Sequence, residues 1–191
     1  MKETRPLPTK DRLIRAAADL FRRSGYNGVG LNELLAAANA PKGSLYHHFP
    51  NGKPDLALAA STWASDRMLR LIAAAYEPAD SFASGTQDLC DRLADLFDRS
   101  GQWDGCPISG TLFEGPDNEA FRDHAAHLYE GWISEASQHA SRLGVDRPEA
   151  VAEEFFMLIH GAWQLSRARR SSAPLRALPG IVGRSYGPRD A

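Results

Sequence analysis

The sequence predicts an all-α fold, in which an N-terminal helix-turn-helix head of three helices is joined by a linking helix to a helical body. Apolar residues recur at helical spacing through most of the 191 residues, and glycine, asparagine or proline separates one periodic stretch from the next. No stretch has the alternating pattern of a β-strand. We expect two closely joined domains, residues 1–53 and residues 54–191, because this length allows a small module joined to a larger core.

The first predicted helix begins at Thr9, in the segment TKDRLIRAAADLFRRSG. Leu13, Ala17 and Phe21 recur every four residues and give this helix one apolar side. Thr9 can cap the first turn, and Gly25 can end the helix in a left-handed conformation. We therefore expect an amphipathic helix that packs on the core of the head.

Two short helices are expected next, over LNELLAAANA and over PKGSLYHHF, which starts at Pro41. Asn39 tolerates the left-handed conformation, so the two helices can meet in a tight corner. Leu45 and Phe49 are four residues apart and can both face inward. The residues left facing outward or sideways are Lys42, Ser44, Tyr46 and His47. This is the pattern of a helix-turn-helix unit, whose second helix fits a DNA major groove; the alternative is a solvent-facing helix of an all-α core.

The charge of the chain is uneven. Residues 1–53 contain nine Lys or Arg and four Asp or Glu, whereas residues 54–191 contain thirteen and twenty. A basic segment on an acidic body is typical of a nucleic-acid-binding module attached to a domain that does not itself bind phosphates. The alternative is that the charges are uneven by chance, so the charge distribution supports DNA binding but does not establish it alone.

Long helices are expected in the body over residues 53–76, 81–101, 117–143 and 148–170. The last of these has a broad apolar face that includes Val151, Phe155 and Ile159, so it is a candidate for a subunit interface as well as for the core. A further helix can start at Pro174. We expect Pro179 and Gly180 to interrupt it, leaving a short helix and a loose tail.

The sequence does not support an enzyme or a membrane protein. It contains no GxSxG motif, no phosphate-binding glycine loop and no coherent acid and base pair, so we expect no catalytic residue and no cofactor. It has no apolar run of membrane-spanning length, and its first residues lack the apolar region of a signal peptide. We therefore expect a soluble, cytoplasmic protein without a membrane partner.

The two cysteines and one histidine pair have simple interpretations. Cys90 and Cys106 lack the spacing of a disulfide framework or a zinc site, so we expect both to be reduced. Cys106 is interpreted as a quiet thiol rather than a redox sensor, because no cation or resolving cysteine is adjacent. His124, His127 and Glu130 have spacing that could hold a metal ion, but no fourth ligand matches, so we interpret them as a solvated helix face.

Residues 9–56 resemble the DNA-binding head of the TetR family of bacterial repressors. The resemblance rests on TKDRLIRAAADLFRRSGY, LNELLAAANA, and KGSLYHHF followed by Lys53, in that order. The body resembles the family mainly in its helical layout, and GCPISGTLFEG resembles a segment that follows the fifth helix in one branch. The resemblance implies a three-helix DNA-binding domain, a connecting helix, and a variable body that binds a small molecule and dimerises through its last two long helices.

Carried over residue by residue, the resemblance implies DNA contacts for the third helix and the start of the fourth. The implied DNA-binding residues are Lys42, Gly43, Ser44, Tyr46, His47 and Lys53. Lysine and histidine can donate to guanine, hydroxyls can bind phosphates, and glycine lets the backbones approach. Lys53 is expected on a phosphate, Thr9 and Tyr26 on the DNA backbone, and His48 as a brace of the third helix.

The chain departs from the family pattern at three positions. Gly30 stands where Ser or Thr usually caps the second helix, which removes one cap hydrogen bond. Asn39 replaces the usual turn glycine, and its tolerance of the left-handed conformation accommodates the change. Pro179, in the expected final helix, puts the details of the dimer interface in question.

The sequence thus predicts a ligand-responsive transcriptional regulator, a homodimer that binds a palindromic operator and is released as a repressor by a small apolar or aromatic effector. The body is rich in aromatic residues, of which Trp103, Phe113 and Trp132 are weak candidate effector contacts, since an aromatic residue of the body is more often a core or dimer contact. The alternative is a DNA-binding architectural or regulatory protein without a small-molecule effector. Effector-dependent loss of the operator separates the two.

Overall fold

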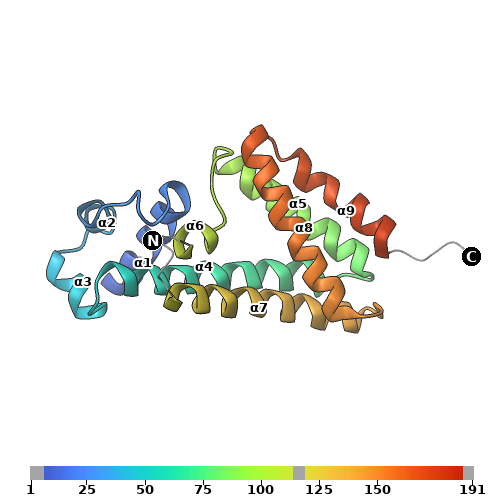
Figure 1. The fold of residues 1–191 in the computed structure, drawn as a ribbon, viewed down its shortest axis with the longest axis horizontal. Coiled ribbons are helices and arrows are strands. Elements are labelled where there is room, and N and C mark those ends of the chain that lie inside the picture. The colour runs from blue at the N-terminus through green and yellow to red at the C-terminus, as the bar shows by residue number, and fades with distance from the viewer. Residues whose placement is uncertain (1–6, 114–118, 187–191) are drawn as a thin grey trace, which may run out of the picture. The chain divides into compact units, whose positions relative to one another are not determined.

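The computed structural model describes residues 7–113 and 119–186, and all the regular structure in these ranges is helical, as the sequence predicts (Figure 1). The helices are α1 (Thr9–Ser24), α2 (Leu31–Ala37), α3 (Lys42–His48), α4 (Lys53–Tyr76), α5 (Phe82–Arg99), α6 (Ser109–Leu112), α7 (Glu119–Arg142), α8 (Pro148–Arg169) and α9 (Ala173–Tyr186). The short α6 falls where the sequence predicts only a break. Residues 117 and 118 of one predicted helix, and residues 187–191 of the predicted tail, lie outside the described residues.

A search of these described helices for a membrane-spanning segment finds none with the required length and apolarity.

The chain divides into two compact units. The first consists of Met1–Ser65 and Pro107–Ala126, so α6 and the first turns of α7 belong with the head helices. The second consists of Asp66–Cys106 and His127–Ala191, and it contains α5, α8 and α9. Two helices, α4 and α7, contribute residues to both units.

The core of the first unit is built from the apolar sides of its helices. Leu13 and Phe21 of α1, Leu34 of α2, Leu45 of α3 and Leu56 of α4 are all fully buried. Helix α1 contacts α2, α3 and α6, and so lies at the centre of this unit. The predicted apolar periodicity of the head therefore corresponds to an actual core.

The two ends of α1 differ in how well the sequence predicts them. Pro8 occupies the N-cap and no side chain caps the helix, so the predicted cap by Thr9 is wrong. Thr9 is already helical, and its Oγ1 accepts a hydrogen bond of 3.4 Å from Arg12 Nη2. Gly25 ends the helix as predicted, with a positive φ of 71° and its N–H donating to the carbonyl of Phe21.

Arg12 of α1 holds the corner between α2 and α3. Its Nε donates to the carbonyl of Ala38 at 3.0 Å, and its Nη2 donates to the carbonyl of Asn39 at 2.9 Å. These carbonyls end α2 and have no partner within the helix, so a charged donor is well suited to them. Asn39 has a φ of 45°, which confirms the predicted left-handed turn. Pro41 is the N-cap of α3 rather than its first residue, one position from the prediction.

Helix α9 in the second unit corrects the prediction for the C-terminal segment. It continues through Pro179 to Tyr186, where the sequence predicts an interruption at Pro179 and Gly180. Leu175, Leu178 and Val182 are buried at 0%, 2% and 2% exposure, and α9 packs against both α5 and α8. This packing outweighs the cost of a proline in a helix, because burial of each large apolar side chain contributes about 1.5–3 kcal/mol.

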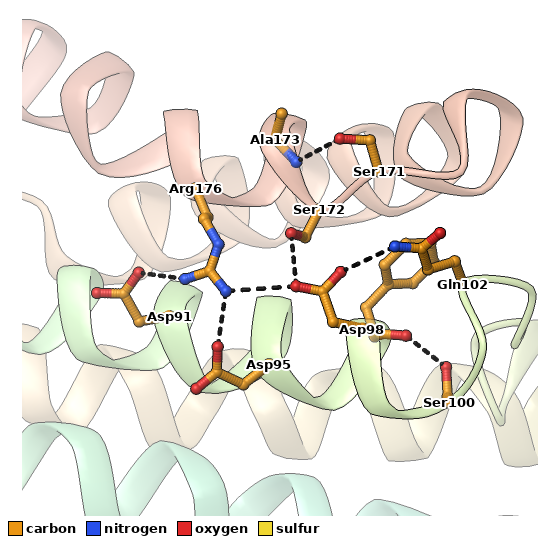
Figure 2. Close-up of polar contacts among 10 residues, drawn as sticks. Asp91, Asp95, Asp98, Ser100, Gln102, Ser171, Ser172, Ala173 and Arg176 are labelled. Atoms are coloured by element: carbon orange, nitrogen blue, oxygen red, sulfur yellow. Dashed lines mark hydrogen bonds and ion pairs between the residues drawn. The ribbon is translucent and has the colours of Figure 1, made fainter.

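Figure 2 shows a polar cluster that joins the start of α9 to α5. Arg176 Nη2 lies 2.7 Å from Asp95 Oδ1 and 3.4 Å from Asp98 Oδ2, and its Nη1 lies 3.4 Å from Asp91 Oδ1. Ser172 Oγ donates to Asp98 Oδ2 at 2.8 Å. The hydrogen bond from Ser172 is the main reason that the pKa of Asp98 lies below its usual value, and bonds from Gln102 and Arg176 act in the same direction.

We predict that Arg12→Ala lowers the free energy of unfolding by about 1–2 kcal/mol, because two charge-assisted hydrogen bonds to backbone carbonyls are lost. Urea denaturation measures the effect. Lys10→Ala, at an exposed position of the same helix, is the matched control and should change stability little. Equal stability of the Arg12 and Lys10 variants would contradict a structural role for Arg12.

We predict that Asp98→Asn destabilises the protein at neutral pH and that the difference from wild type disappears in acid. The folded-state pKa of Asp98 is lowered, so its contribution is present above the ordinary aspartate pKa of about 4 and is lost as pH falls through the folded value. Thermal unfolding at a series of pH values measures this. Asp88→Asn is the control, because Asp88 pairs with Arg92 within α5 rather than with α9. A Tm difference that is independent of pH would argue against the assignment.

Candidate nucleic-acid interface

Helix α3 has two unlike sides. Leu45 and Phe49, at its end, turn inward and are 0% and 4% exposed, as the sequence predicts. The residues that line the opposite side are Lys42, Gly43, Tyr46 and His47, which are exposed, and Ser44, which is half-buried. This short helix thus presents several hydrogen-bond donors on its exposed side. The helix follows the α2 corner in the chain (Figure 1).

Two glycines near α3 have different structural roles. A Cβ built on Gly43 meets no atom within 4 Å, so the packing of the protein does not require a glycine at this position. Gly52 has a φ of 73° in the turn between α3 and α4, where a side chain would be strained. The ring of Tyr46 lies against this turn, since a Cβ on Gly52 would lie 3.2 Å from Tyr46 Cε1. The Gly52 turn therefore supports one flank of Tyr46.

Lys53, at the first position of α4, lies over aromatic rings. Its Nζ is 4.2 Å from the ring centroid of Tyr26 and 5.9 Å from that of Phe21. A cation over the face of an aromatic ring is attracted by its quadrupole, and this fixes the position of the ammonium group. The ring covers one side of the ammonium group, whose three donors point in different directions.

Tyr26, an expected DNA-backbone contact, also packs inside the first unit. Its ring lies 5.6 Å from that of Phe21 and 5.5 Å, edge to face, from that of Phe121 in α7. Its backbone N–H donates to the carbonyl of Gly110 in α6 at 3.2 Å. Partial burial raises the pKa of the phenol. Tyr26 thus connects the head to the segment Pro107–Ala126, a role that sequence reasoning missed.

The two histidines of α3 have different surroundings. The rings of His47 and His48 are 4.8 Å apart, edge to face, at the end of the helix. His48 is half-buried, and its ring lies 6.4 Å from that of the buried Phe49. The position of His48 beside the core is in line with the expectation that it braces the helix, whereas His47 is exposed.

Arg12 is the residue of this site that sequence reasoning missed most clearly. The sequence shows only a basic residue next to the apolar Leu13 on a helix rich in arginine. Its contacts are with carbonyls of Ala38 and Asn39, which follow α2 and are remote in sequence. No local pattern identifies which arginine reaches them.

The three candidate effector contacts have different environments. Trp132 is 2% exposed in the second unit, where its ring packs against Tyr129, Phe156 and His160. Trp103, in the same unit, is 57% exposed; Arg167 lies 5.3 Å from its ring and donates from Nε to its carbonyl at 2.9 Å. Phe113 belongs to the first unit and is 57% exposed. Trp132 is thus surrounded by other aromatic rings.

In the histidine pair of α7, His124 makes hydrogen bonds to α4. His124 Nε2 lies 2.9 Å from Thr62 Oγ1 and 3.2 Å from the carbonyl of Leu58, so this nitrogen carries the proton and donates to α4. A protonated ring nitrogen cannot ligate a metal ion. Among residues 7–113 and 119–186, no group of three or more His, Cys, Asp or Glu side chains is arranged to hold a metal ion.

Two family models match the chain. Residues 13–60 match the model described as bacterial regulatory proteins, tetR family. Residues 83–179 match the model described as transcriptional regulator LmrA/YxaF-like, C-terminal domain. The first match includes the α2–α3 corner and the polar side of α3, and the second includes α5, α8 and most of the structure between them.

Curated relatives and solved structures agree with these models. The HTH-type transcriptional regulator LmrA of Bacillus subtilis is 29% identical over 170 residues, which cover 87% of this chain and 90% of LmrA. The crystal structure of regulatory protein TetR from Rhodobacter sphaeroides has a TM-score of 0.80 and 27% identity, covering 93% of this chain and 98% of that one. The structure of a cysteine mutant of the TetR-family regulator CifR, complexed with 26-bp operator DNA, has a TM-score of 0.79, 22% identity and coverage of 95% and 99%; it shows similarity of fold.

Proposed function

The chain belongs to the TetR family of bacterial transcriptional regulators, and we propose that it is a repressor that leaves its operator when a small apolar or aromatic molecule binds. As a member of this family it is a DNA-binding regulator and not an enzyme. The domain division that we propose assigns DNA binding to residues 1–53, and effector binding and dimerisation to residues 54–191. A regulator of this kind acts in the bacterial cytoplasm, where its operator is.

The observation that carries the proposal is the two-sided structure of α3. Leu45 and Phe49 fix its inner side in the core, and Arg12 fixes the corner before it. The helix is therefore held as a rigid body with its donors directed outward. A recognition helix needs this combination, because base contacts require side chains placed to within a fraction of a hydrogen-bond length.

The proposed contacts follow from the chemistry of each side chain. Lys42 and His47 donate to guanine O6 or N7 in the major groove, while the hydroxyls of Ser44 and Tyr46 donate to phosphates. Gly43 lies between these residues, and the open space around its Cα allows the DNA backbone or a base edge to approach closely. Tyr46, which lies against the Gly52 turn, is pre-positioned for its phosphate.

Lys53 is proposed to bind a phosphate while its ammonium group stays over Tyr26. The ring centroid lies 4.2 Å from Nζ and holds the ammonium group near the start of α4. Lys53 also lies at the N-terminus of α4, where the helix dipole favours an anion. This position supports a contact with the DNA backbone rather than with a base.

We propose that the protein acts as a homodimer through α8 and α9. One helix-turn-helix head buries too little DNA surface for useful specificity, whereas two heads read two half-sites of a palindrome. Exposed apolar side chains on these helices support the choice of surface: Met157 is 62% exposed, Leu165 49% and Ile181 38%. The continuity of α9 through Pro179 keeps Ile181 on a regular helix that packs on α8.

The effector is proposed to be apolar or aromatic, with Trp103, Phe113 and Trp132 as its candidate contacts. Trp132 is the best supported of the three, because Tyr129, Phe156 and His160 surround it with flat surfaces. Flat aromatic walls favour planar ligands through stacking and edge contacts.

A mobility-shift assay tests the whole proposal. The purified protein is added to DNA from upstream of its own gene in an excess of random DNA, and a panel of planar aromatic compounds is then added to the complex. A competitor-resistant band that one compound abolishes is the expected result. A band that resists every compound would favour a regulator without an effector. If no band forms, selection from random duplexes tests whether the protein has any specific site.

We predict that Gly43→Ala weakens operator binding without destabilising the fold. The substitution has room and improves helix propensity, so the free energy of unfolding should stay unchanged or rise by about 0.5 kcal/mol. Operator affinity should fall about tenfold, because the added methyl group occupies the surface proposed to meet DNA. Gly131→Ala in α7, which also has room, should affect stability similarly without loss of affinity. Unchanged operator affinity for the Gly43 variant would show that Gly43 does not lie in the DNA interface.

We predict that Lys53→Ala lowers the slope of log affinity against log salt concentration by about one, because one phosphate contact is lost. Lys42→Ala should instead relax the base preference at one position of the half-site. Both are measured by titration of operator and of single-base variants at several salt concentrations. Arg70→Ala, which removes an exposed cation of α4 outside the proposed interface, controls for net charge. An unaltered salt slope for Lys53→Ala would show that this ammonium group does not bind a phosphate.

A further inference from the structure

Cys106 lies beside two groups that can exchange a proton with it, although the sequence predicts no such neighbour. Its Sγ is 3.5 Å from Tyr129 Oη in α7, and it is hydrogen-bonded to His160 in α8. The interpretation of Cys106 as a quiet thiol considered only the residues adjacent in the sequence, whereas His160 is distant in sequence and lies beside the thiol in space. Cys106 is also only partly buried, so a small molecule can reach it.

The orientation of His160 is fixed by a second hydrogen bond. Its Nδ1–H donates to the carbonyl of Phe156 at 2.8 Å, which leaves Nε2 as the ring nitrogen that can take up a proton. The pKa of His160 is raised, mainly by its hydrogen bond with Cys106. A negative charge on the sulfur raises this pKa further, whereas burial lowers it. The imidazolium form is thus favoured where it can neutralise a thiolate.

The surroundings of the pair are flat and apolar. The ring of His160 lies 5.0 Å from that of Tyr129, edge to face, and 6.5 Å from that of Trp132, nearly parallel. The ring of Trp132 is 6.0 Å from that of Phe156. Such walls favour a planar, conjugated partner for the sulfur over a branched or highly charged one.

The second cysteine provides an internal contrast. Cys90 lies in the core of α5 at 0% exposure, and burial raises its pKa to about 12. A thiol that is inaccessible and protonated is inert. The two cysteines of this chain therefore have opposite environments.

We propose that Cys106 and His160 form a reactive thiolate–imidazolium pair that adds covalently to planar conjugated electrophiles, namely quinones and other α,β-unsaturated carbonyl compounds. The thiol proton passes to His160 Nε2, and the sulfur forms a bond to the β-carbon of the electrophile. The π pair of the carbon–carbon double bond moves to the carbonyl oxygen as an enolate, and the proton returns from Nε2 to the α-carbon. The product is a thioether formed by simple addition, so no oxidant or reductant is required. This reactivity goes beyond operator release and stands independently of it.

The pairing predicts a characteristic pH dependence. An ordinary thiol with a pKa of about 8.5 is about 3% thiolate at pH 7 and about 0.3% at pH 6, so its reactivity falls tenfold over this interval. A thiolate held by an imidazolium loses less, although its lower basicity reduces its nucleophilicity. With both effects included, Cys106 should exceed a free thiol by only about threefold at pH 7 but by about tenfold at pH 6.

The experiment is a time course of labelling by limiting N-ethylmaleimide, an α,β-unsaturated carbonyl compound, with peptide mass spectrometry at pH 6 and pH 8.5. The full-length protein is compared with glutathione and with the variants C106S, C90A and H160Q. We expect Cys106 to be labelled about tenfold faster than glutathione at pH 6, and H160Q to lose this advantage at pH 6 while it changes little at pH 8.5. C90A should react like wild type, and C106S should not react.

Cys90 reports in the same experiment whether each variant is folded, because unfolding exposes it to the reagent. Labelling of wild-type Cys106 no faster than glutathione at pH 6 would overturn the proposal without reference to any variant. An unchanged rate at pH 6 in H160Q, in protein whose Cys90 stays unlabelled, would equally overturn the role of His160.

Discussion

The whole surface that is proposed to face DNA depends on the burial of the inner side of α3. A helix of seven residues is too short to be stable alone in water, and no side chain caps its start. Leu45 and Phe49 supply the tertiary packing that keeps it helical, while Arg12 ties down the carbonyls at the corner before it. Because these contacts fix the helix from within, its outer side chains can stay polar and exposed without loss of structure.

A second constraint lies around Tyr26, where segments remote in sequence meet in one compact unit. The ring of Tyr26 packs on Phe121, its backbone donates to Gly110, and Lys53 lies over its face. The segment Pro107–Ala126 therefore belongs physically with the head. A tyrosine that the sequence suggests as a DNA-backbone contact thus has a packing role in the structure.

In the body, charged side chains and thiols have neighbours that local sequence does not reveal. The cluster of Arg176 with the carboxylates of α5 joins the start of α9 to α5, while the burial of Leu175, Leu178 and Val182 keeps a helix with an internal proline packed. Cys106 and Cys90 are both single cysteines in the sequence, yet one meets His160 and Tyr129 while the other is enclosed by apolar side chains. The tolerance of a proline and the environment of a thiol are in this sense properties of the fold.

Periodicity and local conformational preference were enough to predict α1 to α5, α7 and α8, the inward side of α3 at Leu45 and Phe49, and the left-handed Asn39. These features depend on residues within a few positions of one another, so the amino-acid sequence alone contains them. The Pro8 cap of α1, the continuity of α9 through Pro179, the partners of Arg12 and the pairing of Cys106 with His160 became visible only in three dimensions. Most of these depend on groups brought together by packing between distant segments, and the free energy of such contacts is greater than the local preferences that a sequence pattern records.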